Sequence, residues 1–356
     1  MNTKKWSIRI LVIWLVLVLA AGGTVILVDP YHHYHKPLGC FTYNVGDAAY
    51  TNDGKCKNFD YEALITGTSM TMGFEETIAE ELFGKTFLRA TFLGEGFKRV
   101  GENLRTAIQH NEDLELVIRS VDTLWFVTAK DWMANEEYPE YLYNGKLLDD
   151  AEYLYNFDVW ADALIPTLKT FRLSGGGSAG VSVPKDSEGK QYLDQEKALD
   201  NYVREPKQDT PMDENQTAEY FAAMKDNLYY NLLQVVEENP DIEFYFFFPP
   251  YSILWWDGIN QAGPGRVDRR IDMEQYAIEM ILAYDNVKLF SFFNHFDLIC
   301  DLDYYSDDIH YNTAVSTMML EWMKDGAYQL TKDNYMEYIS EIRSFYTTYD
   351  YESMFR

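Results

Sequence analysis

The stretch "ALITGTSMTMGF", residues 63–74, decides how the rest of the chain is interpreted. An apolar run ends at Thr66-Gly67-Thr68, and Ser69 follows just before a pattern typical of a helix start. A buried strand that breaks at glycine and presents a serine is how several α/β hydrolases place a nucleophile. Many ordinary strand-to-helix turns have the same pattern. The choice depends on whether a histidine and an acid occur elsewhere in a suitable context.

Apolar runs alternate with amphipathic stretches on both sides of Ser69. The runs lack the two-residue alternation of a half-exposed strand, and amphipathic stretches of helical spacing follow them. This pattern predicts an α/β fold with a parallel sheet buried on both faces, whose functional residues lie at the carboxyl ends of the strands. The expected strands are 63–67, 85–92, 114–127, 242–252 and 286–293, and the expected helices are 72–84, 97–111, 213–240, 271–284 and 314–329.

A histidine and an acid for Ser69 occur in "DLDYYSDDIHYN", residues 301–312, after the last expected strand. Asp307 lies three residues before His310. In a tight loop or a first helical turn, this spacing lets the carboxylate reach the imidazole Nδ1–H and leaves Nε2 free to accept a proton. Each motif alone is common by chance. Their joint occurrence at the ends of the first and last strands predicts a nucleophile, a base and an orienting acid.

The first 28 residues predict a membrane segment. Lys4, Lys5 and Arg9 precede "ILVIWLVLVLAAGGTVILV", residues 10–28, which carries no charge. As a helix these residues span roughly 28 Å, about the thickness of the hydrocarbon core. The basic flank predicts a cytoplasmic N-terminus and an extracytoplasmic chain after Asp29. A cleaved signal peptide with Val18-Leu19-Ala20 before the cleavage site is the alternative, although the apolar stretch continues beyond it.

The expected organisation is an anchor over 1–29, a juxtamembrane segment over 30–60, one domain over 61–330 and a helical tail over 331–356. An insertion at about 135–212 interrupts the domain, and its Tyr-rich first part is a candidate cap over the sheet. Its Gly- and Ser-rich stretch, residues 173–190, is a loop or linker by composition.

The charge and the cysteines narrow the function further. The formal net charge of −27 argues against nucleic-acid binding, which requires clustered Lys and Arg. Cys40 and Cys56 could pair in an oxidising compartment or remain thiols, and with Cys300 they do not form a metal site. The "YHHYH" stretch, residues 31–35, is interpreted as a membrane-interface segment rather than a set of metal ligands.

These residues resemble the SGNH/GDSL hydrolase superfamily over roughly 60–330. Gly-x-Ser follows the first strand, a glycine follows the second, and Asp-x-x-His lies near the C-terminus. "YPEYLY", "FFFPPYS" and "YYSDDIHYN" are most similar to a membrane-anchored Gram-positive branch, related to the D-alanine-transfer protein of teichoic-acid D-alanylation. The resemblance implies a three-layer α/β/α sandwich with a parallel, flavodoxin-like sheet.

The resemblance also implies roles for individual residues. Ser69 would be the nucleophile, His310 the base and Asp307 its orienter. The backbone N–H groups of Ser69 and of Gly94, with Gly96 as the second candidate, would form the oxyanion hole.

The chain departs from the family pattern in two places. Gly67-Thr68-Ser69 replaces the usual Gly-Asp-Ser, and the asparagine expected after the third strand has no counterpart. Asp122 occupies that neighbourhood, which makes it a candidate residue of the substrate pocket. A carboxylate there would repel a developing oxyanion unless protonated. The loss of one such donor typically lowers turnover by about 10²–10³-fold. Arg119 is a candidate replacement donor, or it lies on the outer face of the sheet.

Aromatic residues follow the fourth strand in "FFFPPYSILWW", residues 246–256. Tyr251 and Trp255 are expected either to line a pocket for a carbohydrate or an acyl chain, or to pack in the core at a helix start.

The sequence therefore predicts a single-pass, membrane-anchored acyl esterase or acyltransferase that acts on cell-envelope polymers without a metal or organic cofactor. Other membrane-bound envelope-modification proteins are possible partners. A non-catalytic scaffold subunit and an esterase of small molecules are the alternatives.

Overall fold

The computed structural model describes residues 3–44, 48–134, 138–172, 181–182 and 195–356. The chain forms two compact units, which are described separately. Unit 1 comprises Met1–Phe59 and Glu137–Glu188, and unit 2 comprises Asp60–Glu136 and Gly189–Arg356. The insertion expected at about 135–212 is therefore divided between the units. The Gly- and Ser-rich stretch 173–190 lies outside the described residues, apart from Val181–Ser182.

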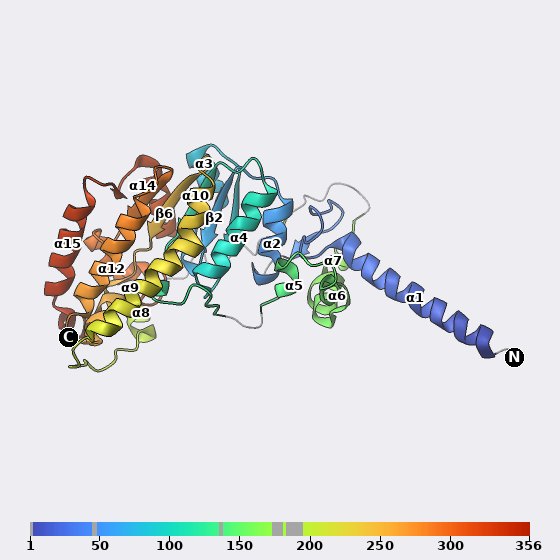
Figure 1. Cartoon of the computed structure of the whole chain (residues 1–356), viewed down its shortest axis with the longest axis horizontal. Helices are drawn as coiled ribbons and strands as arrows, with labels where there is room; N and C mark the ends of the chain where they lie inside the picture. The colour runs from blue at the N-terminus through green and yellow to red at the C-terminus, as the bar shows by residue number, and fades with distance from the viewer. Residues whose placement is uncertain (1–2, 45–47, 135–137, 173–180, 183–194) are drawn as a thin grey trace. The chain divides into compact units, whose positions relative to one another are not determined.

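Unit 2 contains a six-stranded sheet with the order β3-β2-β4-β6-β7-β8 (Figure 1). Its strands are β2 (Ala63–Gly67), β3 (Phe87–Thr91), β4 (Leu116–Ser120), β6 (Glu243–Phe248), β7 (Val287–Ser291) and β8 (Gln329–Leu330). The first five are parallel to their neighbours, which confirms the predicted α/β class, and β8 is antiparallel to β7. The strand β8 is not among the expected strands, because two residues give no periodic pattern.

Helices pack against both faces of this sheet. On one face, Ile65, Ile118 and Phe247 pack against Phe74, which precedes α3 (Glu76–Phe83), and against Met319 of α14 (Thr313–Asp325). Burial on both faces explains why the strands are continuously apolar.

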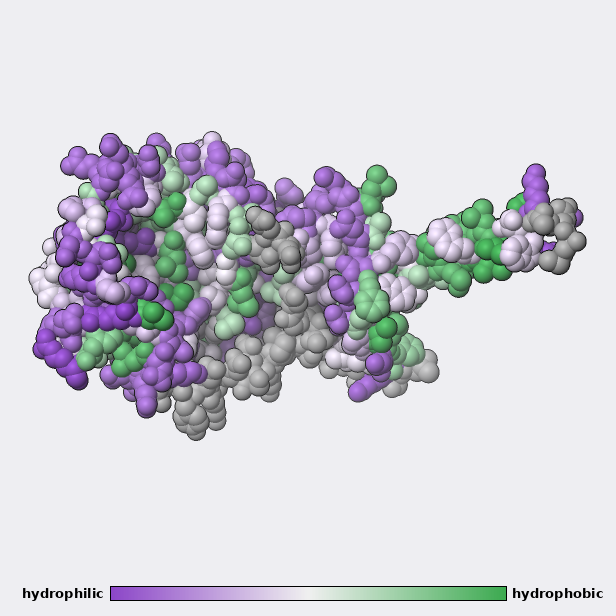
Figure 2. Space-filling model, turned by 90° about the horizontal axis from the view of Figure 1, so that it is seen from below, coloured by the Kyte–Doolittle hydropathy of each residue, from purple (hydrophilic) through white to green (hydrophobic). Residues whose placement is uncertain are grey.

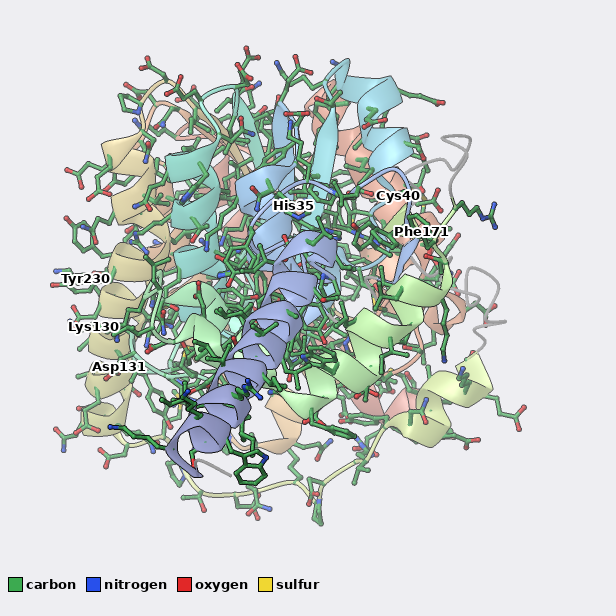
Figure 3. All side chains as sticks on the ribbon, turned by 90° about the vertical axis from the view of Figure 1, so that its right-hand side faces the viewer. His35, Cys40, Lys130, Asp131, Phe171 and Tyr230 are labelled. Carbon is green, nitrogen blue, oxygen red and sulfur yellow. The ribbon has the colours of Figure 1, made fainter. Side chains whose placement is uncertain are left out.

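The other face is covered by α4 (Phe97–His110) and by α9 (Glu214–Leu228), the π-helical turn η4 (Tyr229–Leu233) and α10 (Gln234–Glu238) (Figure 1). The close approach of α4 to η4 requires a glycine. A Cβ atom on Gly101 of α4 would lie 2.6 Å from the carbonyl oxygen of Asn231 in η4. At the rim, the Lys130 ammonium lies 3.9 Å from the centre of the Tyr230 ring (Figure 3).

The C-terminal tail is an integral part of unit 2. Tyr346 of α15 (Tyr335–Thr348) stacks on Trp256 of α11 (Ile253–Gln261), with ring centres 3.8 Å apart. Arg343 binds Asp268 and Asp272 of α12 (Arg266–Ile281). The remaining elements of unit 2 are α8 (Gln195–Asn201), α13 (Phe296–Cys300) and the 3₁₀ turns η1 (Ser69–Thr71), η2 (Thr123–Trp125), η5 (Leu302–Tyr304) and η6 (Tyr351–Phe355).

Unit 1 joins the juxtamembrane segment to the first part of the insertion. Its elements are α1 (Thr3–Val28), β1 (Tyr43–Asn44), α2 (Ala48–Asn58), α5 (Glu140–Tyr143), α6 (Asp150–Tyr155), the π-helical turn η3 (Val159–Leu164), α7 (Ile165–Lys169) and β5 (Val181–Ser182). Val25, Tyr43, Tyr153 and Leu164 share one apolar core. The N–H of Arg172 donates to the carbonyl of Cys40, so Phe171 and Cys40 lie close together (Figure 3).

The helix α1 is long and apolar enough over Lys4–Val28 to cross a membrane. Immediately after it, the buried Asp29 carboxylate accepts hydrogen bonds from the backbone N–H groups of His33, Tyr34 and His35. The "YHHYH" stretch thus folds around a carboxylate. Cys40, Cys56 and Cys300 all remain thiols.

Candidate active site

The structure places Ser69, His310 and Asp307 in a hydrogen-bonded chain. The Ser69 Oγ lies 2.8 Å from the His310 Nε2, and the His310 Nδ1 lies 2.7 Å from the Asp307 Oδ2. Ser69 is half-buried, and the side chains of His310 and Asp307 are 37% and 29% exposed. The serine and the base are therefore within hydrogen-bond distance and open to solvent, as nucleophilic catalysis requires.

The turn that carries Ser69 is fixed by the residues around it. Gly67 has a φ of +147°, and a Cβ atom there would lie 2.1 Å from the Ser120 Oγ, so only glycine fits. The Thr68 hydroxyl accepts a hydrogen bond from the Met70 N–H and caps η1. The Thr71 hydroxyl is 3.0 Å from that of Thr91, at the end of β3. The serine thus follows directly from the carboxyl end of β2.

The loop that carries His310 is closed on itself. Tyr305 and Tyr311 form an antiparallel bridge, and the Ser306 N–H donates to the His310 carbonyl at 2.9 Å. The Asn312 side chain accepts from the Val315 N–H and caps α14.

Two tyrosines, the buried Tyr305 and the half-buried Tyr311, attach this loop to its neighbours. The Tyr311 hydroxyl donates to the Met70 carbonyl at 2.5 Å, and the Tyr305 hydroxyl donates to the Pro250 carbonyl at 2.9 Å. Tyr311 follows His310 and Met70 follows Ser69, so their hydrogen bond keeps the base next to the serine. Neither tyrosine is among the site residues predicted from the sequence, although Tyr311 is adjacent to His310 in the motif.

Asp307 orients His310 and stays ionised. Burial alone would raise its pKa, but hydrogen bonds from the His310 side chain and from the backbone N–H groups of His310 and Ile309 lower the pKa below its ordinary value. In return, the hydrogen bond to Asp307 raises the pKa of His310 above its ordinary value of 6.5, against the opposing effect of desolvation. The pair is arranged to stabilise an imidazolium once His310 accepts a proton.

Asp122 lies beneath the nucleophile turn rather than in a pocket. Its carboxylate is 1% exposed and accepts hydrogen bonds from the hydroxyls of Thr68 at 2.8 Å, Ser120 at 2.7 Å and Tyr251 at 3.3 Å. Burial raises its pKa, and these hydroxyls partly offset that effect. The expectation that Asp122 lines the substrate pocket is wrong, because all its contacts are internal.

Tyr251 and Trp255 also belong to the core. Tyr251 is fully buried and Trp255 is 7% exposed, and the Trp255 ring stacks on that of Phe293. The Ser252 hydroxyl accepts from the Leu254 N–H and caps α11. Of the two expectations for this stretch, a packed helix start is therefore correct, and pocket-lining roles for Tyr251 and Trp255 are wrong.

Arg119 points to the helices on the face of the sheet that carries α4. Its guanidinium is fully buried and donates to the carbonyls of Asn231 at 2.9 Å and Phe97 at 3.3 Å. Because these carbonyls hold its terminal amino groups, Arg119 is not a replacement oxyanion donor in this arrangement. The outer-face alternative is correct.

The two glycine candidates for the oxyanion hole differ in access. Gly94 is exposed with a φ of +70°, whereas Gly96 is buried and a Cβ atom there would lie 2.8 Å from the Trp132 ring. Within the described part of the chain, the backbone N–H groups of Ser69 and Gly94 have no hydrogen-bond acceptor. Gly94 is therefore the better candidate.

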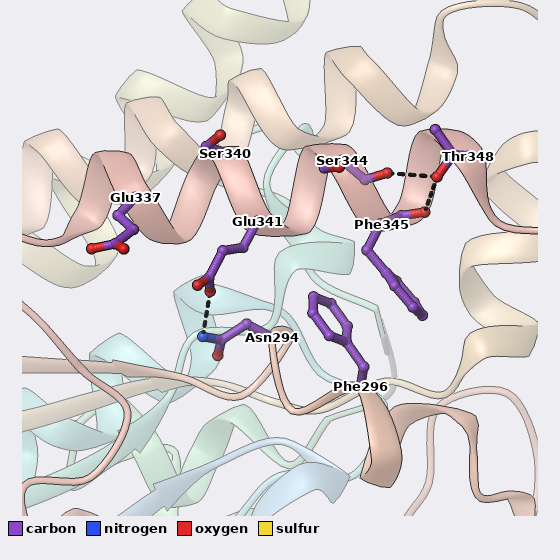
Figure 4. Close-up of a pocket in the computed structure, with 8 residues that line it drawn as sticks. All are labelled: Asn294, Phe296, Glu337, Ser340, Glu341, Ser344, Phe345 and Thr348. Carbon is purple, nitrogen blue, oxygen red and sulfur yellow. Dashed lines mark hydrogen bonds between the residues drawn. The ribbon is translucent and has the colours of Figure 1, made fainter.

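A groove of about 910 Å³ lies elsewhere on unit 2, between α15 and the turn after β7 (Figure 4). Asn294 and Phe296 line one side, and Glu341 and Phe345 of α15 line the other. None of the three catalytic candidates lines it. Among the described residues, no three His, Cys, Asp or Glu side chains are grouped to hold a metal ion.

Comparisons with known proteins do not assign the chain to a family. No family model and no curated protein matches it. One solved structure that it resembles is "The structure of a putative platelet activating factor from Streptococcus pneumonia". The two chains share 14% sequence identity with a TM-score of 0.39, over 78% of this chain and 90% of the other. This likeness is too distant to carry an argument about function.

Proposed function

We propose that the chain is a serine acyl esterase or acyltransferase of the SGNH type, in which unit 2 is the three-layer α/β/α catalytic domain. The hydrogen-bonded chain of Ser69, His310 and Asp307 carries this proposal, with separations of 2.8 and 2.7 Å. A serine in contact with a histidine that a carboxylate orients is the arrangement that activates a hydroxyl for attack on an acyl group.

In the proposed reaction, the Ser69 Oγ attacks the acyl carbonyl carbon as His310 Nε2 takes the hydroxyl proton. The backbone N–H groups of Ser69 and Gly94 stabilise the oxyanion of the tetrahedral intermediate. When the intermediate collapses, the bond to the leaving alcohol breaks and His310 returns the proton to its oxygen. Water or an acceptor hydroxyl then attacks the acyl-Ser69 ester, and His310 again accepts and returns the proton.

Acyl groups on cell-envelope polymers are the proposed substrates. The helix α1, which is long and apolar enough to span a membrane, supports a single-pass anchor. The basic residues Lys4, Lys5 and Arg9 favour a cytoplasmic N-terminus and an extracytoplasmic unit 2. Tethering raises the local concentration of membrane-proximal acceptors such as wall polymers. Other membrane-bound envelope-modification proteins are the proposed partners.

A fluorophosphonate probe tests the proposal on the full chain in detergent, with the adduct measured by intact mass. We expect stoichiometric labelling that is lost in Ser69→Ala and strongly reduced in His310→Ala. Ser344→Ala, which removes an exposed serine of α15, is the matched control and should label like the unaltered chain. Added polyols that accept the acyl group would distinguish a transferase from an esterase.

A non-catalytic scaffold is the second candidate, and Asp122 is the observation that favours it. In the sequence, Asp122 takes the place of the asparagine that the resemblance implies for the oxyanion hole, so only backbone donors remain. A folded chain that the probe does not label would support the scaffold over the enzyme.

A further inference from the structure

One face of α1 packs against the rest of unit 1. Gly22, Val25 and Val28 are buried, and Val18 is half-buried on the same face. The Tyr155 hydroxyl, at the end of α6, donates to the Val18 carbonyl at 3.2 Å. A Cβ atom on Gly22 would lie 2.6 Å from this hydroxyl, so an alanine there would force the Tyr155 side chain to move.

This packing conflicts with an anchor that is surrounded by lipid along its whole length. At 1.5 Å per residue, Gly22 lies about 9 Å and Val18 about 15 Å below Val28 along the helix. The apolar residues before Val18, 10–17, span only about 12 Å, far less than the ~30 Å hydrocarbon core. If α1 crosses a membrane, the elements that contact Val18 and Gly22 must reach below its surface.

The surface of these elements is unusually apolar. Leu147 and Leu148, just before α6, are 83% and 91% exposed, and Phe157, just after it, is 80% exposed. Figure 2 shows hydrophobic residues along α1 and on the neighbouring surface of unit 1. Large apolar side chains that are almost fully exposed and grouped around one short helix indicate an interaction surface.

We propose that α6 and its two flanking turns insert into the lipid bilayer, in the leaflet on the Val28 side of α1. Leu147, Leu148 and Phe157 lie among the acyl chains. The Tyr155 ring also lies below the membrane surface, and its hydroxyl has its hydrogen-bond acceptor there in the Val18 carbonyl. The charged side chains of Lys146, Glu152 and Asp158 in the same region are exposed. The proposal requires them to extend toward the headgroups.

A lipid surface fits better than a protein partner because the patch is continuous with α1. The contact between Tyr155 and Val18 ties it to a helix whose own environment is expected to be lipid. The proposal rests on the anchor in the proposed function, but not on the chemistry of Ser69. If the proposal is correct, part of unit 1 is embedded in the membrane together with α1.

The test uses the full chain reconstituted in phosphatidylcholine and phosphatidylglycerol vesicles that contain a diazirine phospholipid. After irradiation, digestion and mass spectrometry locate the labelled residues. We expect label in α1 and also at Leu147, Leu148 and Phe157. Val203 of unit 2, which is 76% exposed, is the control for nonspecific labelling and should remain unlabelled.

Label in α1 alone would overturn the inference and leave the anchor intact, and would fit a protein partner or a second copy that covers the patch. An unlabelled α1 would overturn the anchor as well. Leu148→Glu combined with Phe157→Glu should lower labelling of the 147–157 segment at least about tenfold without changing that of α1. Because both positions are exposed, unit 1 should still fold. Val203→Glu, which adds the same charge at an exposed position of unit 2, is the matched control.

Discussion

The Asp122 carboxylate accepts a hydrogen bond of 2.8 Å from the hydroxyl of Thr68, the residue immediately before Ser69. The same carboxylate accepts from Ser120 and Tyr251, so it joins the ends of β4 and β6 to the turn after β2. An acid that binds three hydroxyls in the interior is well placed to fix a turn and poorly placed to contact a substrate. Asp122 therefore stabilises, from the interior, the turn that carries the proposed nucleophile.

Asp122→Asn discriminates between this role and an oxyanion role. If Asp122 faced the oxyanion, a neutral amide with N–H donors would increase the labelling of Ser69 by the probe. In the observed arrangement, both carboxylate oxygens accept hydrogen bonds from hydroxyls. The amide nitrogen of the asparagine would therefore face a hydroxyl that donates to Asp122, and a buried hydrogen bond would be lost. We expect labelling to slow roughly tenfold, in line with about 1–3 kcal/mol for an unsatisfied buried group. The measurement is the rate of probe incorporation, with thermal unfolding as the control for folding.

Gly67→Ala should destabilise unit 2 strongly. The φ of +147° is strained for alanine, and the new methyl group would overlap the Ser120 Oγ at 2.1 Å. Gly84→Ala is the matched control, because Gly84 also has a positive φ but nothing lies within 4 Å of its Cβ position. We expect Gly67→Ala to lower the free energy of unfolding by at least about 2 kcal/mol more than Gly84→Ala. Equal losses in urea denaturation would contradict the close approach of β2 and β4.

Tyr311→Phe tests whether the loop of His310 is held by the nucleophile turn. The variant removes the hydroxyl that binds the Met70 carbonyl at 2.5 Å. Tyr346→Phe is the control, since the Tyr346 hydroxyl also binds a backbone carbonyl, that of Phe293, at 2.5 Å, although Tyr346 is buried and Tyr311 is half-buried. Both variants should lose about 1–2 kcal/mol of stability. Only Tyr311→Phe should also slow probe labelling of Ser69, and an equal effect of both variants on labelling would show that Tyr311 acts through stability alone.

The sequence predicts the parts of this structure that depend on local patterns. The strand around Ile65 could be identified because it is buried on both faces and therefore continuously apolar. Ser69, Asp307 and His310 could be grouped because parallel strands bring their carboxyl ends to one edge of a sheet.

The orientations of Asp122, Arg119 and Tyr251 could not be predicted in the same way. Each lies near the carboxyl end of a strand, where a side chain can point into the core, into a helix layer or into a site. Tertiary packing decides among these directions, and no local pattern records it. Likewise, the packing of 138–172 with the juxtamembrane segment arises from long-range contacts such as the hydrogen bond from the Tyr31 N–H to the Tyr153 hydroxyl, at 3.1 Å.

The pH dependence of labelling should follow the protonation of His310. The serine is activated only when His310 is neutral, so the rate should rise with pH. Because the hydrogen bond to Asp307 raises the pKa of His310, the midpoint should lie above the ordinary value of 6.5. Asp307→Asn removes the negative charge that favours the imidazolium, and the midpoint should move to lower pH. The plateau should also fall by about 10²–10⁴-fold, because an amide can donate to Nδ1 and favour the wrong tautomer.

Asp308→Asn is the control for this experiment. Asp308 raises the pKa of His310 only through its charge, after the larger effects of Asp307 and of burial. Its replacement should therefore shift the midpoint slightly downward and leave the plateau unchanged. A midpoint that stays in place in Asp307→Asn would mean that the labelling rate does not report on His310. The hydrogen bond of 2.8 Å between Ser69 and His310 would then be structural, and the scaffold function would become the better account of unit 2.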